Sequence, residues 1–399
     1  MVTVLIGVVW AAMLVPYLKG IFNHLPLLAD YSELMVVLSF VLPVVFALPA
    51  LLNKFCLVDY LFYFLLVTYY FSNYIFFPEN AEYLTENAVL CLLCVYPFYF
   101  IGRIIDIDKQ FNLFVFLSTI CIVMDLFYFL FYAPSQKNMD EVAGYDNMYA
   151  SYVILPHVAL LLWSTLARFR LWKAVLFVLG VLFMLSCGTR GPLVCLGFFG
   201  AIYFFFYMNF KGAIYVKGTI IATLLLILAN LRSIALLLAE QFSEMQLSTR
   251  ILEKVILGDL GNDTYRSVLR DKIYEVLDSD GHFFGLGLFG CQNYDVAYPH
   301  YLPLDLAGTY GYVIGYALLI VLFVLIGWAV WIARRTKSQI FILFLFSLGI
   351  IKLLLSGTFV NEVFFYMLIG FCAKTILSRN STCKVPTEIQ QSSNNLTIW

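Results

Sequence analysis

The chain has 399 residues, of which 62% are hydrophobic and only 12% are charged. A soluble globular protein carries about 25% charged residues, so this composition excludes an ordinary water-exposed surface and indicates a protein embedded in a bilayer. The formal net charge of −1 gives no support for binding nucleic acid through bulk charge, and no nucleic-acid partner is expected.

Apolar stretches of membrane-spanning length recur along the chain. A spanning helix needs about 20 mostly apolar residues, and this length predicts about twelve spans. In chain order they are 2–18, 34–52, 55–77, 87–102, 111–133, 148–166, 172–187, 190–210, 214–239, 306–333, 338–356 and 359–377. The expected fold is an all-α polytopic membrane protein, with transmembrane helices 1–9 in residues 1–239 and helices 10–12 in residues 306–377.

The basic residues predict the orientation of these spans, because cytoplasmic loops carry an excess of Lys and Arg. With a cytoplasmic N-terminus, most basic residues outside 240–305 fall on the cytoplasmic side, whereas the short outer connections hold only Lys19, Lys137 and Arg190. Both termini are then cytoplasmic. The polar tail, 378–399, is expected to be disordered.

Residues 240–305 form the one long hydrophilic segment, and the predicted orientation places it on the outer side. A connection of this length inside a compact protein is usually functional or disordered. The part that begins at Arg266 keeps apolar residues on one helical face, namely Val268, Leu269, Ile273, Val276 and Leu277. This spacing predicts an amphipathic helix at the outer membrane surface, with Arg266 and Arg270 flanking its apolar face.

Two short motifs receive structural interpretations. The run Gly285-Leu-Gly-Leu-Phe-Gly290 matches a dinucleotide-binding pattern, but no βαβ unit surrounds it, so we interpret it as a tight glycine turn that closes the amphipathic helix. Cys91 and Cys94 form a C-x-x-C motif inside a hydrophobic span without neighbouring metal ligands. No metal and no cofactor are expected.

Arg190 follows Ser186-Cys-Gly-Thr in a short outer turn, where basic residues are otherwise nearly absent. A solvated arginine in a tight turn is one interpretation. We favour the other, in which its guanidinium group binds phosphate oxygens. Phosphate binding requires an arginine at this position, whereas a solvated turn does not.

His300 lies at the end of the long segment, beside Asp305 and the tenth span. Its imidazole titrates near neutrality, so it can act as an acid, a base or a hydrogen-bond donor. The other histidines, His24, His157 and His282, are expected to be structural.

Three charged residues fall inside or at the ends of predicted spans, where ionisable groups are candidates for function. Asp125 lies in mid-span, whereas Lys352 and Glu362 lie near the outer ends of their spans. Lys352 and Glu362 are expected to pair with each other. A purely structural ion pair and a functional one remain equal alternatives.

These elements together resemble the O-antigen polymerase and O-antigen ligase superfamily. The run Ser186-Cys-Gly-Thr-Arg190-Gly191 resembles its S-x-S-R-G outer hairpin, and Arg266 followed by His282-Phe-Phe-Gly285-Leu-Gly287 resembles its R-x-x-x-W…P-x-x-G-x-G loop. Pro299-His300-Tyr301, with Gly311 and Gly315, resembles the His-Asn stretch and glycine-rich helix start that follow. The resemblance covers about 130 residues, and their order and spacing agree with the family pattern.

The chain also departs from that pattern. Arg270 stands where the family usually has Trp, His282 where it has Pro, and Tyr301 where it has Asn. A glutamate common before the glycine is replaced around Thr309–Tyr310.

The resemblance implies a metal-independent, GT-C-like glycosyltransferase in a bacterial cytoplasmic (inner) membrane. We expect it to polymerise oligosaccharide repeat units carried on undecaprenyl diphosphate into O-antigen, capsule or exopolysaccharide, with a chain-length regulator as a possible protein partner. A ligase that transfers glycan to lipid A core or to protein is the alternative. A polysaccharide flippase is the competing class, but the charge gathers in one outer segment and no repeat relates the two halves.

The expected catalytic residues are Arg190, Arg266 and His300. The two arginines would stabilise the leaving diphosphate, and His300 would activate or orient the acceptor hydroxyl. Arg250, Arg270 and Asp305 are expected to bind substrate.

Overall fold

The computed structural model describes residues 55–131, 143–208, 213–244, 249–258, 264–279 and 283–382, and every element in these ranges is a helix. The expected spans 2–18 and 34–52 lie outside them, as does His24. The α-helices are α4 (Leu57–Phe76), α5 (Ala81–Val89), α6 (Phe98–Ile104), α7 (Ile107–Phe131), α9 (Ala143–Ala167), α10 (Leu171–Ser186), α11 (Gly191–Ile202), α12 (Ala213–Ala229), α13 (Leu231–Glu244), α14 (Arg250–Leu257), α15 (Thr264–Asp278), α16 (Leu302–Tyr310), α17 (Tyr312–Ile332), α18 (Lys337–Phe346), α19 (Lys352–Leu355) and α20 (Val363–Thr382).

Six short elements of other helical types interrupt or join these helices. Three are 3₁₀ turns, η2 (Pro78–Asn80), η5 (Gly290–Tyr294) and η7 (Phe359–Asn361). Three are π-helical, η3 (Leu90–Val95), η4 (Tyr203–Tyr207) and η6 (Ser347–Ile351). A π-helical turn inserts an extra residue and changes where the following side chains point, and such turns are frequent at functional sites.

Five helical stretches among the described residues are long and apolar enough to cross a membrane, namely 78–104, 107–127, 150–167, 312–332 and 337–355. The bent pair α12 and α13 makes a sixth, and the apolar helices 171–186, 191–207 and 363–378 are shorter. These nine stretches coincide with nine of the predicted spans, so the expectation of an all-helical chain with several membrane-spanning helices is confirmed. The remaining expected span in this region, 55–77, becomes the 20-residue α4, whose many tyrosines make it less apolar.

The lipid-facing character of the bundle follows from its exposed side chains. Large apolar residues cover the outside of α4, α12 and α17, and examples are Phe64, Leu226, Leu228, Ile320 and Val324. A soluble monomer rarely exposes contiguous apolar surface on this scale, whereas a helix in lipid satisfies its backbone internally and turns such side chains outward.

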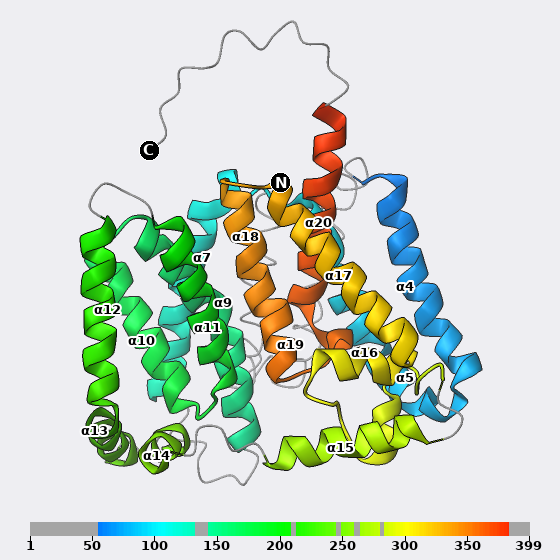
Figure 1. Cartoon of the computed structure of the whole chain (residues 1–399), viewed down its shortest axis with the longest axis horizontal. Helices are drawn as coiled ribbons and strands as arrows, with labels where there is room; N and C mark the ends of the chain where they lie inside the picture. The colour runs from blue at the N-terminus through cyan, green and yellow to red at the C-terminus, as the bar shows by residue number, and fades with distance from the viewer. Residues whose placement is uncertain are drawn as a thin grey trace, which may run out of the picture.

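The predicted span 214–239 is not one straight helix. α12 ends at Ala229, α13 begins at Leu231, and the two axes differ by 71°. The amide of Asn230 bonds back to the carbonyls of Leu226 and Ile227, which ends α12. α13 then turns its apolar residues Ala235 and Phe242 inward against α14, and both helices lie across the lower end of the bundle (Figure 1).

The glycine motif forms the expected tight turn. Gly285 and Gly287 have φ angles of 78° and 75°, in the left-handed region that favours glycine. The amide of Leu286 donates to the carbonyl of Gly308 at 2.6 Å, so the turn lies directly on α16. A Cβ at Gly285 would come within 2.4 Å of the Gly311 amide nitrogen, which excludes any larger residue.

Asparagines fasten this turn to the first described helices. Asn73 of α4 accepts a hydrogen bond from the amide of Leu288 at 2.8 Å, and Asn80 of η2 donates to the carbonyl of Leu286 at 2.7 Å. Because these bonds join positions more than 200 residues apart, they hold the outer segment against the bundle.

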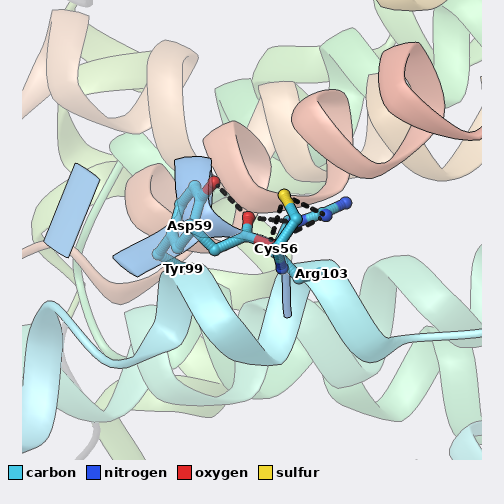
Figure 2. Close-up of polar contacts among 4 residues, drawn as sticks. All are labelled: Cys56, Asp59, Tyr99 and Arg103. Atoms are coloured by element: carbon cyan, nitrogen blue, oxygen red, sulfur yellow. Dashed lines mark hydrogen bonds and ion pairs between the residues drawn. The ribbon is translucent and has the colours of Figure 1, made fainter. Parts of the chain in front are cut away.

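At the opposite end of α4, a charged cluster joins this helix to α6. Arg103 donates through Nε and Nη2 to the two carboxylate oxygens of Asp59, at 2.5 and 2.9 Å (Figure 2). Tyr99 and the amide of Cys56 also donate to Asp59, at 2.7 and 2.9 Å. Burying a carboxylate without a partner is costly, and here the buried Asp59 is fully paired, so this cluster is a structural anchor.

Candidate functional site

The helix α15 carries Arg266 and has the predicted amphipathic character. It lies across the same end of the bundle as α13 and α14 (Figure 1). Ile273 and Leu277 are buried against Leu286, Val296 and Leu304, as their spacing predicts. Val268 departs from the prediction, since its side chain is 56% exposed.

Arg266 projects from α15 toward the end of α19. Its Nη1 donates to the carbonyl of Leu355 at 2.7 Å, and its side chain is half-buried. The carbonyls at a helix C-terminus have no partner within the helix, and a cation there also faces the negative end of the helix dipole. Arg266 therefore fixes the end of α19. Its guanidinium group has five N–H donors in total, of which this hydrogen bond uses one.

Arg190 is half-buried and stands at the N-cap of α11, after a turn in which Gly188 has a φ of 72°. The next residue, Gly191, is in direct contact with Tyr152 of α9. A Cβ built on Gly191 would lie 1.9 Å from the Tyr152 hydroxyl oxygen, so only glycine allows this approach. Tyr152 therefore borders the Arg190 turn.

Lys352 and Glu362 form the ion pair that their positions predict, through Nζ and Oε2. Lys352 begins the single turn α19, directly after the π-helical η6, and Glu362 precedes α20. The Glu362 side chain is 5% exposed and that of Lys352 is 22% exposed, so the lysine is the more exposed member of the pair. Lys352 Nζ also lies 5.1 Å from the centroid of the Tyr152 ring.

Tyr152 connects these groups. It touches Gly191 through its hydroxyl and Lys352 through its ring, and it lies within electrostatic reach of Arg266. Ser356, directly after α19, is within hydrogen-bonding reach of the same side chain. The turn of Arg190, the side chain of Arg266 and the Lys352–Glu362 pair therefore converge on one residue, which comes from a fourth helix.

His300 joins the same region through Tyr298, which is also within electrostatic reach of Tyr152. The rings of Tyr298 and His300 are 4.3 Å apart. His300 has a φ of 56°, which is uncommon for a residue with a side chain. The half-buried imidazole thus belongs to the connection that precedes α16.

Asp305 is buried in α16 and accepts a hydrogen bond from the amide of Phe359 at 2.9 Å. The side chain of Thr358 lies within hydrogen-bonding reach of the same carboxyl group. Burial raises the pKa of Asp305 to about 7, against the smaller lowering effect of these two hydrogen bonds. The carboxyl group thus holds the connection between α19 and α20 beside the Lys352–Glu362 pair.

The two remaining predicted substrate-binding residues differ in position. Arg270 is half-buried one turn beyond Arg266, and its guanidinium carbon lies 5.5 Å from the centroid of the Tyr301 ring. Arg250 is exposed at the start of α14, which packs on α13 rather than on α15 (Figure 1). The structure therefore brings Arg270 close to the site and leaves Arg250 exposed on a separate part of the protein.

Ser118, His157 and Asp125 are polar residues buried in the helical bundle. Ser118 Oγ and His157 Nδ1 lie 3.0 Å apart in the core, in agreement with the structural role predicted for His157. His282 lies outside the described residues. Asp125 is completely buried, and among the described residues neither of its carboxyl oxygens has a hydrogen-bond partner.

The chemistry of the cluster favours an anionic ligand. Arg266 and Lys352 supply two positive charges, Glu362 supplies one negative charge, and Arg190 lies in the adjoining turn. Within the part of the chain that the structure describes, no group of three or more His, Cys, Asp or Glu residues is arranged to hold a metal ion. Half-buried cations interact strongly with anionic groups such as phosphate, because partial burial lowers the effective dielectric constant around them.

Sequence reasoning missed Tyr152 as the residue on which the site converges. A tyrosine near the end of a predicted span is common, because aromatic rings favour the membrane interface, so its position carries no distinctive signal. Lys352 was recognised as a charge within a span, but the sequence did not connect it with Arg190 or Arg266.

Comparison with known protein families, curated proteins and solved structures finds no match to this chain. The fold and the site therefore define a class only, that of an all-helical membrane protein with a cluster of cationic side chains at one end of its bundle.

Proposed function

We propose that this protein polymerises oligosaccharide repeat units linked to undecaprenyl diphosphate, at the outer face of a bacterial cytoplasmic membrane. The observation that carries the proposal is the convergence of the Arg190 turn, Arg266 and Lys352 on Tyr152. α15, which carries Arg266, lies across one end of the bundle together with α13 and α14 (Figure 1). A lipid-linked diphosphate would present its charge at this depth.

In the proposed reaction, a hydroxyl group of the acceptor sugar attacks the anomeric carbon of the donor. The bond between that carbon and the diphosphate oxygen breaks, and the electron pair leaves with the diphosphate. Arg190 and Arg266 stabilise this developing negative charge as preorganised donors, a role that in other enzymes contributes about 100- to 1,000-fold in rate per donor. His300 accepts or orients the proton of the attacking hydroxyl.

A ligase would use the same leaving group, and the two functions differ only in the acceptor. A flippase would move the lipid-linked glycan without breaking a bond. The grouping of Arg190, Arg266 and His300 in one region favours a transferase over a flippase. A transport pathway would instead place its charged residues along the bundle axis.

Deletion of the gene distinguishes these functions by the length and location of the glycan. For a polymerase, the deletion strain exports glycan only as single repeat units, seen as one short band on a gel of the surface polysaccharide. Long lipid-linked polymer that fails to reach the surface would indicate a ligase. Absence of all outward repeat units would indicate a flippase, and either of these two results would refute the polymerase proposal.

A further inference from the structure

Lys352 lies at the proposed site but has no part in the transfer described above. Its ammonium group contacts the Glu362 carboxylate and lies over the Tyr152 ring. The carboxylate is buried behind it, while the lysine side chain keeps 22% of its surface exposed. Lys352 is therefore the more accessible member of the pair.

We propose that Lys352 is a third cation of the anion site, which binds an oxygen of the lipid-linked diphosphate while Glu362 holds its ammonium group in place. This inference rests on the proposed function, since it names a further ligand for that substrate. An ammonium group has three donors, so Lys352 can keep Glu362 as a partner and still donate to a phosphate oxygen.

The position of Lys352 is coupled to that of Arg266 through α19. This helix is a single turn in which Lys352 is the first residue and Leu355 is the last, and Leu355 supplies the carbonyl that Arg266 binds. The two cations therefore act on the same four residues. A substrate oxygen that binds one of these two cations is therefore held close to the other cation.

The π-helical turn before Lys352 explains how the lysine reaches this place. η6 covers Ser347–Ile351 and leads directly into α19. Ser347 donates to the carbonyl of Cys195 at 2.5 Å, which fixes η6 against α11, the helix that begins after Arg190. The inserted residue thus turns Lys352 toward Tyr152, and the same contact ties it to the Arg190 turn.

The ion pair also decides how Lys352 can be tested. Removing one partner would leave the other charge buried and uncompensated, which destabilises a protein strongly. A test of Lys352 must therefore change both residues.

The experiment compares four variants of the purified full-length protein in detergent. The double variant Lys352→Gln, Glu362→Gln removes both charges, and the double variant Lys352→Glu, Glu362→Lys keeps an ion pair but moves the cation to the buried position. Lys352→Arg keeps the cation in place. Lys374→Gln is the matched control, because Lys374 is also half-buried and lies 5.7 Å from a phenylalanine ring, beside the carbonyl of Ile105.

The readout is the thermal stabilisation produced by inorganic pyrophosphate and by farnesyl diphosphate, with sulfate as the comparison anion. We expect the half-saturating concentration of both diphosphates to rise about 10- to 100-fold in the two double variants, the equivalent of one charge-assisted hydrogen bond. Lys374→Gln should stay close to the unmodified protein, and Lys352→Arg, which keeps the cation, should lose less binding than either double variant. A purely structural pair would instead let the charge-swapped variant recover full binding.

Unchanged diphosphate binding in both double variants would overturn the inference, and so would equal stabilisation by sulfate. The polymer assay separates this result from the fate of the proposed function. If the protein polymerises repeat units but binds diphosphate without Lys352, only this inference fails. If it binds diphosphate through Lys352 but makes no polymer in any assay, the proposed function fails and the anion site stands.

Discussion

Replacement of Arg266 gives the most direct test of the charged site. In Arg266→Ala, the donor to the Leu355 carbonyl disappears, and so does the positive charge near Tyr152. If Arg266 stabilises the leaving diphosphate, the rate of transfer should fall about 100- to 1,000-fold, which corresponds to about 2.7–4 kcal/mol of transition-state stabilisation. Arg266→Lys keeps the charge but loses the planar guanidinium group, so a single ammonium must serve both Leu355 and the substrate, and activity should still be impaired.

The structure also predicts a smaller effect on stability. A hydrogen bond from a charged group contributes about 1.5–3 kcal/mol, and here it caps only the four-residue α19. Activity must therefore be compared at equal amounts of folded protein, by measuring polymer length in cells and the transfer rate of the purified protein. Arg334→Ala is the control, because Arg334 is exposed in the turn between α17 and α18, away from the site.

The reasoning would be refuted by normal activity of both Arg190→Ala and Arg266→Ala at matched expression. Loss of activity in Arg334→Ala to the same degree would show that the arginine effects come from membrane insertion. His300→Ala should reduce the rate of transfer more than the affinity for the donor, since its proposed contact is with the acceptor.

The remaining predictions concern metals, pH, the membrane and the core. Activity of the purified protein should survive EDTA, and inhibition that a divalent cation reverses would reveal a metal site. Burial raises the pKa of Asp305 to about 7, above its value in an unfolded chain, so stability should be highest below about pH 4 and fall by up to about 4 kcal/mol as the pH rises from about 4 to about 7. Thermal unfolding of Asp305→Asn should lose most of this pH dependence, and an unchanged profile would assign it to another group. A reporter active only in the cytoplasm should work when inserted beside Arg334 and stay silent beside Asp295, whereas the opposite pattern would invert the orientation. Asp125→Leu should raise the melting temperature, because a buried carboxyl group without hydrogen bonds costs about 1–3 kcal/mol; a lower melting temperature would show that Asp125 has a ligand.

The helical framework was predictable because lipid imposes a simple rule on the sequence. Long apolar stretches must become helices, and the positions of nine predicted spans agree with helices of the structure. The amphipathic α15 and the glycine turn at Gly285 were also predicted, since both depend on local spacing. The pairing of Lys352 with Glu362 was expected from their equal depth.

The breaks within helices were not predicted. Asn230 ends α12 although apolar residues continue beyond it, and η6 inserts a π-helical turn in a run that reads as one helix. Such changes depend on what packs against a helix rather than on its own sequence. α20 likewise continues to Thr382, five residues beyond the predicted end of the last span at 377.

The membership of the site could be predicted only in part. Arg190, Arg266 and His300 stood out because each is unusual for its local setting. Tyr152 could be recognised as a site residue only from the packing of the helices, since its contact with Gly191 joins α9 to α11. The separation of Arg250 from the other arginines also depends on packing, because α14 turns toward α13.

The close packing of the glycine turn on α16 limits how the protein can open. Main-chain hydrogen bonds join Leu286 and Gly287 to the carbonyls of Gly308 and Thr309, so residues 285–290 cannot lift away without breaking them. This stretch is a fixed wall rather than a hinged lid. α15, by contrast, is held through side chains, such as Arg266 on Leu355 and Asp278 on Tyr312. These side-chain contacts can exchange one at a time, so α15 can shift where the glycine turn cannot.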